Sequence, residues 1–174
     1  EFRRVLFRSD LSGESYYTQQ DLTDLTDYLF SVEYWGYYEL LIFANTLDVL
    51  NHETLMVLAK EMSRRSDFYK EIPNNRRMIS TMLLNVYITC IEREELIDAL
   101  YFEKQLNQCF FIETEIYERL VFQYAQNYYQ YKKEGNNQSI IEMKKCIGAM
   151  KLAGSEHIAK TYEAHLKKLI EENS

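Results

Sequence analysis

The chain has 174 residues, of which 47% are apolar and 27% are charged, a balance typical of a globular domain and not of a disordered chain. Five glycines and one proline are too few for the many turns of a β-sandwich or β-barrel. The net charge of −7 disfavours direct binding to DNA or to an anionic membrane, because phosphate groups would be repelled.

Cysteine usage and hydropathy indicate a cytoplasmic protein. Cys90, Cys109 and Cys146 are far apart and form no C-x-x-C pair, which is typical of reduced thiols in the cytosol. The longest apolar run, residues 40–44, is far shorter than the roughly 20 residues of a membrane span, so we expect no membrane partner. The basic first residues are not followed by the apolar core of a signal peptide.

The first nine residues, EFRRVLFRS, fit no later pattern and resemble translated adapter or vector sequence. We therefore expect a non-native tail over residues 1–9 and one helical domain over residues 10–174. A natural flexible tail is the alternative. On the first interpretation, the true N-terminus of the protein is missing from this sequence.

Capping residues and helix breakers predict eight helices and no strand in the remaining chain. Thr18 is expected to cap the first helix, Asn51 the third and Ser155 the last, whereas Pro73 begins the fourth and Gly135 ends the sixth. The expected ranges are 18–31, 36–50, 51–70, 73–91, 94–108, 113–133, 136–154 and 155–172.

Short connections predict that successive helices pair as antiparallel hairpins. The second and third, fourth and fifth, and sixth and seventh helices would form three pairs, and the eighth would cap the array with its charged face. The leading helices end near Leu50, Ile91 and Lys133, a period of about 41–42 residues, longer than the roughly 34 of tetratricopeptide repeats. We expect an all-α fold, an α-solenoid of tetratricopeptide-like hairpins; a closed helical bundle is the alternative.

The fourth helix is apolar nearly all round, which is typical of a helix buried between neighbours. One narrow polar strip remains, formed by Thr81, Asn85, Thr89 and Glu92. Such a strip is expected on the inner wall of a ligand groove. Alternatively, Asn85 only bonds to the backbone of a neighbouring helix, because buried polar groups must find a partner.

Two arginines open the same helix, at the end where the helix dipole disfavours positive charge. A pair placed against local preference suggests a role, and Arg76 and Arg77 could bind a carboxylate of a ligand. Arg77 lies one turn before Thr81 and therefore extends the polar strip.

Asparagines recur at the repeat period, with Asn45, Asn85 and Asn127 spaced 40 and 42 residues apart. An amide side chain both donates and accepts, so it can pair with the backbone of an extended peptide without reading its sequence. Chance recurrence, with purely structural asparagines, is the alternative. The predicted peptide-binding residues are Asn45, Arg76, Arg77, Thr81, Asn85, Gln123 and Asn127.

Patterns of catalysis and metal binding are missing from the sequence. No acidic residue lies three positions before any of the three histidines, and no phosphate-binding loop, dinucleotide fingerprint or nucleophile elbow occurs. We therefore expect no enzyme activity, no metal and no cofactor. A helical hydrolase is a weak third hypothesis, since no nucleophile and base converge.

Five segments in order, at matching distances, resemble the Rgg/GadR/MutR transcriptional regulators of streptococci and related Gram-positive bacteria. They are WGYYELLIFANTL, IPNNRR, LLNVYITCIER, DALYFEKQL and IYERLVFQYA, and the likeness extends over about residues 21–172. The resemblance implies a helix-turn-helix DNA-binding domain followed by paired helices, homodimers, and short peptide pheromones bound on the concave side of the repeats. Asn45, Asn85 and the NNRR motif at residues 74–77 match family segments.

The leading hypothesis is therefore a peptide-sensing and dimerisation domain of a quorum-sensing regulator, with DNA contacted only through a missing N-terminal domain. A helical-repeat scaffold for protein–protein interaction is the alternative. An abundance of tyrosine near the start of the chain, with an uncapped end of the repeat array, also favours a homodimer.

Overall fold

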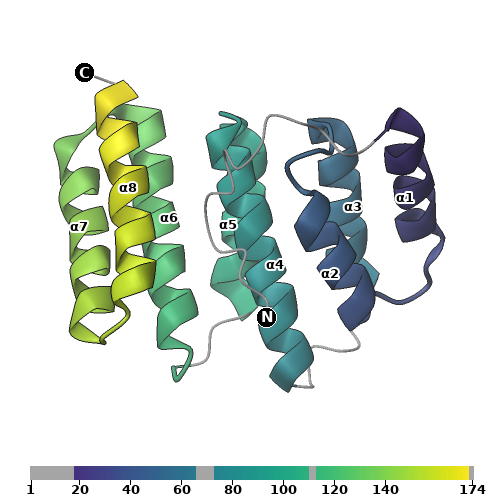
Figure 1. The fold of residues 1–174 in the computed structure, drawn as a ribbon, viewed down its shortest axis with the longest axis horizontal. Helices are drawn as coiled ribbons and strands as arrows, with labels where there is room; N and C mark the ends of the chain where they lie inside the picture. Colours follow the sequence, from purple (N-terminus) through teal and green to yellow (C-terminus); the bar gives the residue numbers. More distant parts are fainter. Residues whose placement is uncertain (1–17, 66–72, 110–112, 173–174) are drawn as a thin grey trace. The chain divides into compact units, whose positions relative to one another are not determined.

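The computed structural model describes residues 18–65, 73–109 and 113–172, and in these ranges it contains eight α-helices and no strand (Figure 1). The all-α fold predicted from the sequence is confirmed. No helix of the described ranges is long and apolar enough to span a membrane. The helices are α1 (Gln19–Ser31), α2 (Tyr37–Thr46), α3 (His52–Arg65), α4 (Pro73–Glu92), α5 (Leu96–Cys109), α6 (Ile116–Glu134), α7 (Asn137–Leu152) and α8 (Glu156–Glu172).

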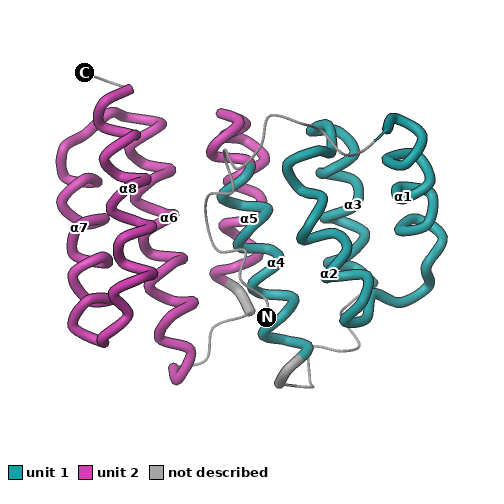
Figure 2. The backbone as a smooth tube through the Cα atoms, in the orientation of Figure 1, with its two compact units in different colours: residues 1–89 teal, residues 90–174 magenta. Residues whose placement is uncertain are grey.

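The chain divides into two compact units, residues 1–89 and residues 90–174 (Figure 2). Unit 1 contains α1, α2, α3 and most of α4. Unit 2 contains the last three residues of α4 and α5 to α8. Each unit has its own set of fully buried side chains, so each has a core that can be described by itself.

In unit 1, α1 begins at the predicted cap. The Thr18 hydroxyl accepts from the Asp21 amide at 3.1 Å, and the Asp21 carboxylate accepts from the Thr18 amide at 2.8 Å. This reciprocal pair satisfies two amides that have no partner within the helix. At its other end, α1 is tied to α3 by Arg65, whose guanidinium donates to the carbonyls of Phe30 and Val32. These bonds anchor the loop that leads to α2.

In unit 2, α7 packs against both α6 and α8, and α5 contacts α6. A buried polar contact also joins α6 to α8, where the Tyr124 hydroxyl lies 2.7 Å from Nδ1 of His165. Tyr162 packs edge-on against Tyr124, and Tyr128 packs edge-on against His165, with ring centroids 4.8 Å apart in both pairs. Aromatic side chains of two alternate helices therefore form the centre of this core.

Each unit shows contacts between a helix and the next helix but one, α1 with α3 and α6 with α8. Stacked helical hairpins produce such contacts, because the equivalent helices of neighbouring repeats pack on one another. The helix boundaries agree with expectation at Thr18, Pro73 and Gly135, which takes the left-handed conformation after α6. The third helix was expected to reach Lys70, but residues 66–72 lie outside the described ranges.

Some predicted boundaries are wrong; the sixth helix, for example, begins at Ile116 and not near Glu113. The second helix ends at Thr46, not at Leu50, and the Thr46 hydroxyl donates to the carbonyls of Ile42 and Phe43 where the helix ends. The fifth helix begins at Leu96, because Glu94 takes a left-handed conformation with φ of 62°. The Glu95 amide then donates to the Cys90 carbonyl at 2.9 Å, a helix-ending bond that usually follows a glycine.

The side chains of Cys90 and Cys146 are described, and both are free thiols and buried. Burial raises the pKa of the Cys90 thiol to about 12, with the nearby Asp98 carboxylate adding to the effect. Burial also raises the pKa of the Cys146 thiol to about 11. Both groups are therefore protonated at neutral pH and poorly nucleophilic, as structural cysteines usually are.

His165 predicts an acid-sensitive stability. Burial lowers its pKa from 6.5 to about 3, and the nearby Lys168 and Lys132 lower it further. Between pH 6.5 and 3 the His165 imidazole is protonated in the unfolded chain but neutral in the folded chain. The free energy of unfolding should therefore fall as the pH drops from 6.5 toward 3. Urea unfolding at several pH values measures this slope.

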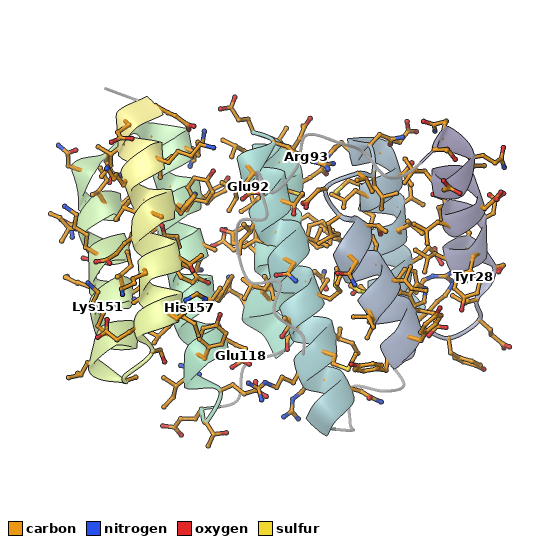
Figure 3. All side chains as sticks on the ribbon, viewed as in Figure 1. Tyr28, Glu92, Arg93, Glu118, Lys151 and His157 are labelled. Atoms are coloured by element: carbon orange, nitrogen blue, oxygen red, sulfur yellow. The ribbon has the colours of Figure 1, made fainter. Side chains whose placement is uncertain are left out.

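His165→Gln should flatten that slope, because an amide does not titrate. His157, on the exposed surface of α8 (Figure 3), supplies the matched control, and His157→Gln should leave the slope unchanged. Equal slopes for wild type and His165→Gln would contradict the assignment of a neutral buried imidazole.

Candidate functional site

The middle of α4 is buried on nearly every side, as its all-round apolar sequence predicts. Every residue from Met82 to Ile91 is buried, including Asn85 and Thr89, whereas Arg77 and Glu92 at the two ends of the polar strip are exposed. The strip therefore runs from solvent into a desolvated region and out again. Polar groups in that region must be hydrogen-bonded or they destabilise the fold.

The hydroxyl groups of α4 bond to the turn that precedes each of them. The Thr81 hydroxyl donates to the Arg77 carbonyl at 2.8 Å, and the Thr89 hydroxyl donates to the Asn85 carbonyl at 2.9 Å. Ser80, which is fully buried, donates to the carbonyls of Arg76 and Arg77. Back-bonding of this kind is the usual way for a helix to carry threonine and serine, so these hydroxyls are satisfied without a ligand.

The Asn85 side chain differs from these hydroxyls. The residue is only 7% exposed, and its side-chain amide forms no hydrogen bond with another described residue, but the amide atoms are not fully buried and water can reach them. An amide carries two donors and an acceptor, so a ligand that reaches Asn85 can bond to groups that no described residue uses. Asn85 is therefore the residue of the strip that a ligand would satisfy.

The two arginines that precede the strip differ in exposure. Arg77 is exposed in the first turns of α4, and Arg76 is half-buried. Both make contacts within the protein. Their positive charge lies at the helix end whose amides also attract anions, so the start of α4 favours a carboxylate.

Asn45, the remaining predicted residue of unit 1, lies on α2. Its side chain is exposed and donates from Nδ2 to the Leu41 carbonyl at 2.9 Å. The bond uses one of its two amide protons, so the second proton and the oxygen face solvent. Asn45 remains able to bind a peptide, but the fold already uses part of its hydrogen-bonding capacity.

The other two predicted residues, Gln123 and Asn127, lie on α6 in unit 2. Asn127 donates from Nδ2 to the Gln123 carbonyl at 2.8 Å, as Asn45 does within α2, and Gln123 is exposed. Beside them, Gln126 donates to the Glu103 carboxylate of α5 at 2.9 Å. The predicted residues thus lie on α2 and α4 in unit 1 and on α6 in unit 2, and a single groove that contains all of them stays a prediction.

A cavity that the sequence did not predict lies between α7 and α8. It measures about 600 Å³, within the roughly 300–1,000 Å³ typical of ligand pockets. Its walls include Lys144, Ile147, Gly148 and Lys151 of α7 and Leu166 and Ile170 of α8. A cavity between two helices requires their relative placement, which no periodicity reveals; the one sequence signal was a glycine inside a helix.

The sequence matches the model of a protein family, described as the HTH-type transcriptional regulator Rgg, C-terminal domain, over residues 5–164. The chain belongs to this family. The predicted resemblance is thereby confirmed, and the family is one of transcriptional regulators and not of enzymes.

Solved structures of Rgg proteins have the same fold. The SHP pheromone receptor Rgg2 of Streptococcus dysgalactiae is 30% identical with a TM-score of 0.76, and the match covers 87% of this chain and 56% of the receptor. A cysteine-to-serine variant of that receptor matches at 30% identity over 87% of this chain and 55% of its own, with a TM-score of 0.77. This chain thus spans little more than half the length of these proteins.

A Listeria monocytogenes EGD-e protein, described as a transcriptional regulator, shares the fold at lower identity. It is 19% identical with a TM-score of 0.80, and the match covers 93% of this chain and 56% of that protein. The helical arrangement is therefore retained where most side chains have changed.

Asn85 predicts a stability gain on removal of its amide. Asn85→Leu keeps the branching of the side chain at Cγ and loses no hydrogen bond made with another described residue, so it should raise the free energy of unfolding by about 1 kcal/mol. Chemical denaturation measures this change. A loss of stability of similar size would show that the amide bonds within the protein and has a structural role.

Proposed function

We propose that this chain is the peptide-sensing part of an Rgg regulator and that a short signalling peptide binds along the polar strip of α4. The observation that carries the proposal is the nearly buried Asn85 side chain, whose amide forms no hydrogen bond with another described residue. Similarity to a receptor for the SHP pheromone, over most of this chain, supports the same conclusion.

The strip suits an extended peptide because its threonine hydroxyls bond within α4 whereas the Asn85 amide does not. Thr81 and Thr89 lie one turn on either side of Asn85 and bond to their own helix, so they leave the Asn85 amide to bond to one peptide unit. Apolar side chains on the same helix are buried beside it. A peptide amide that lies beside Asn85 would form a hydrogen bond between two uncharged groups, in a place with little competing water.

Arg76 and Arg77 would hold an acidic side chain or the terminal carboxylate of the peptide at the start of α4. Asn45 has a second amide proton and an oxygen available for a peptide backbone. Gln123 and Asn127, on α6 of unit 2, stay predicted peptide-binding residues. Because amides contact backbone groups, this arrangement would grip the peptide while its apolar side chains select among sequences.

The longer protein would act as a cytoplasmic homodimer that contacts DNA through a helix-turn-helix domain outside this chain. The net charge of this chain supports DNA contact through another domain, because a charge of −7 disfavours direct contact with phosphates. Nothing in the proposal requires catalysis or a cofactor.

Asn85 provides the first binding test. Asn85→Leu should weaken binding of a fluorescein-labelled SHP-class pheromone by about 5- to 150-fold, because a peptide amide would lose a bond worth about 1–3 kcal/mol. Fluorescence polarisation measures the affinity. Asn107→Leu, at an exposed position of α5, is the matched control and should bind like wild type.

The combination of results is informative, because the same Asn85→Leu substitution is expected to stabilise the fold. A more stable variant that binds less peptide identifies a group kept for the ligand at the expense of stability. Wild-type affinity in a folded Asn85→Leu variant would refute the α4 site.

Arg77 provides a second test that separates charge from shape. Arg77→Ala should weaken binding at low salt, and the difference from wild type should shrink at about 1 M salt, where charges are screened beyond about 3 Å. Arg77→Lys should retain part of the affinity. If the loss is the same at every salt concentration, Arg77 does not contact a charged group of the peptide.

A further inference from the structure

Tyrosine side chains are exposed on α1, on α2 and on the loop between these helices. Tyr28 of α1 is 40% exposed, Tyr37 and Tyr38 of α2 are 55% and 62% exposed, and Tyr34 of the loop is 54% exposed. Single exposed aromatic residues are normal, whereas a group of them marks a place of interaction. We call this group the tyrosine surface; it lies in unit 1 and contains none of the predicted peptide-binding residues.

Glu39 connects the α1 part of the tyrosine surface to the α2 part. The Tyr28 hydroxyl donates to Oε1 of Glu39 at 2.9 Å, and the Gly36 amide donates to Oε2 at 3.0 Å. The bond to Glu39 raises the pKa of Tyr28, and the nearby Tyr38 adds to the effect. Tyr28, labelled in Figure 3, therefore lies close to both Glu39 and Tyr38.

Lysine and arginine do not occur from residue 18 to residue 59, which includes the whole tyrosine surface. The carboxylates of this stretch are those of Asp21, Asp24, Asp27, Glu33, Glu39, Asp48 and Glu53. Asp24 lies one turn before Tyr28 on the same face of α1, and Asp21 lies two turns before it. Glu33 is next to Tyr34 in the loop. The tyrosine rings are therefore surrounded by acidic side chains.

The carboxylates nearest the tyrosines have no cationic partner among the described residues. Asp21, Asp24 and Glu39 accept hydrogen bonds from uncharged groups only. Asp27 and Glu33 make no ion pair or hydrogen bond with any residue of the described ranges. The negative charge of the tyrosine surface is therefore not neutralised within this part of the chain.

The cations of α3, which packs against α1, are bonded elsewhere. Arg64 and Arg65 both pair with Glu61 at 2.7 Å, and Arg65 also donates to two carbonyls at the end of α1. Lys60 forms no ion pair with any of the five carboxylates nearest the tyrosines. The electrostatic potential at the surface is therefore negative and favours a positively charged partner.

Glu39 is a fixed acceptor within this surface. Each of its two carboxylate oxygens accepts one hydrogen bond and can accept a second. A guanidinium group binds a carboxylate through two parallel bonds and also stacks on aromatic rings, whereas an ammonium group binds as a point charge. Tyr28 and Tyr38 provide rings close to this carboxylate, so the surface favours arginine over lysine.

We propose that the tyrosine surface binds an arginine-rich segment of a partner protein, with one guanidinium on Glu39 beside the rings of Tyr28 and Tyr38 and others on the carboxylates of α1. A second copy of this chain is disfavoured here, although abundant tyrosine alone suggests a homodimer, because two acidic surfaces would repel each other. Nucleic acids and anionic membranes are disfavoured for the same reason. This role is separate from the sensing of a signalling peptide on α4.

A fluorescein-labelled peptide in which arginine alternates with serine is the probe, and its counterpart carries lysine in place of each arginine. Fluorescence anisotropy against the 174-residue chain should show the arginine peptide binding roughly fivefold more tightly, the difference expected when guanidinium groups stack on exposed rings. Equal affinity of the two peptides, or no binding of the arginine peptide, would overturn the proposal.

Charge-matched variants separate the tyrosine surface from the net charge of the chain. Asp24→Asn combined with Asp27→Asn should weaken binding of the arginine peptide by about fivefold at low salt, because two exposed ion pairs are lost. Glu171→Gln combined with Glu172→Gln removes the same charge from exposed positions of α8 and should have little effect. Equal losses would show that the peptide responds only to net charge, and the proposal would be wrong.

Ring variants test the choice of arginine over lysine. Tyr28→Leu combined with Tyr38→Leu should make the two peptides bind alike, whereas Tyr28→Phe combined with Tyr38→Phe should retain the preference for arginine. Both double variants remove the hydroxyl that bonds to Glu39, so they differ only in the rings. A preference retained by the leucine variant would contradict the assignment of these rings.

Sedimentation velocity tests the other occupant. If Asp24→Asn combined with Asp27→Asn changes the dimerisation of the chain and the arginine peptide does not bind, the surface joins two copies and the proposal is wrong. The two sites also fail separately: the Asp24 and Asp27 variant should bind an SHP-class pheromone like wild type, and Asn85→Leu should bind the arginine peptide like wild type. Loss of pheromone binding in Asn85→Leu alone therefore concerns the function proposed above and not the tyrosine surface.

Discussion

Desolvation of α4 is the constraint on which the rest of the structure depends. From Met82 to Ile91 no side chain of this helix is exposed, so packing has to surround it on nearly every side. A helix in such a place can carry a polar side chain only if that side chain bonds to the backbone of its own helix or to a bound ligand. Thr81 and Thr89 follow the first route. Asn85 makes no such bond to its own helix, so its amide can bond to a ligand.

Threonine and serine suit the polar faces of this chain because their hydroxyls can bond to the backbone of their own helix. Thr46 on α2 and Ser80 on α4 follow the same rule as Thr81 and Thr89, and each donates to a carbonyl one turn earlier. Asn45 and Asn127 do so through one amide proton only. Such side chains make a helix face polar without leaving a polar group that lacks a hydrogen-bond partner. A polar face alone is therefore weak evidence for a binding site. A polar group without a hydrogen-bond partner is stronger evidence.

Sequence reasoning predicted the helices well where a single residue imposes the boundary. Thr18 with Asp21, Pro73 and Gly135 act locally, so their effects can be read without knowing the fold. The start of α5 was missed because Glu94 holds a left-handed conformation that sequence reasoning expects of glycine.

The site was predictable to a lesser degree. The polar strip followed from helix periodicity, but periodicity treats Thr89 and Asn85 alike, and only atomic distances show that one hydroxyl is satisfied and one amide is not. The α7–α8 cavity needs the relative placement of two helices, which no residue pattern contains.

The single tryptophan gives the two units different optical signals. Trp35 is buried in unit 1, edge-on to Phe43 with ring centroids 5.4 Å apart, whereas the core of unit 2 contains the packed tyrosines Tyr124, Tyr128 and Tyr162. Indole fluorescence therefore follows the unfolding of unit 1, and the signal of the packed tyrosine rings in near-ultraviolet circular dichroism is weighted toward unit 2. Repeat proteins lose cooperativity when the coupling between neighbouring segments is weak. Superimposable transitions from the two signals would mean that the units melt together, and the separation between them otherwise measures the coupling directly.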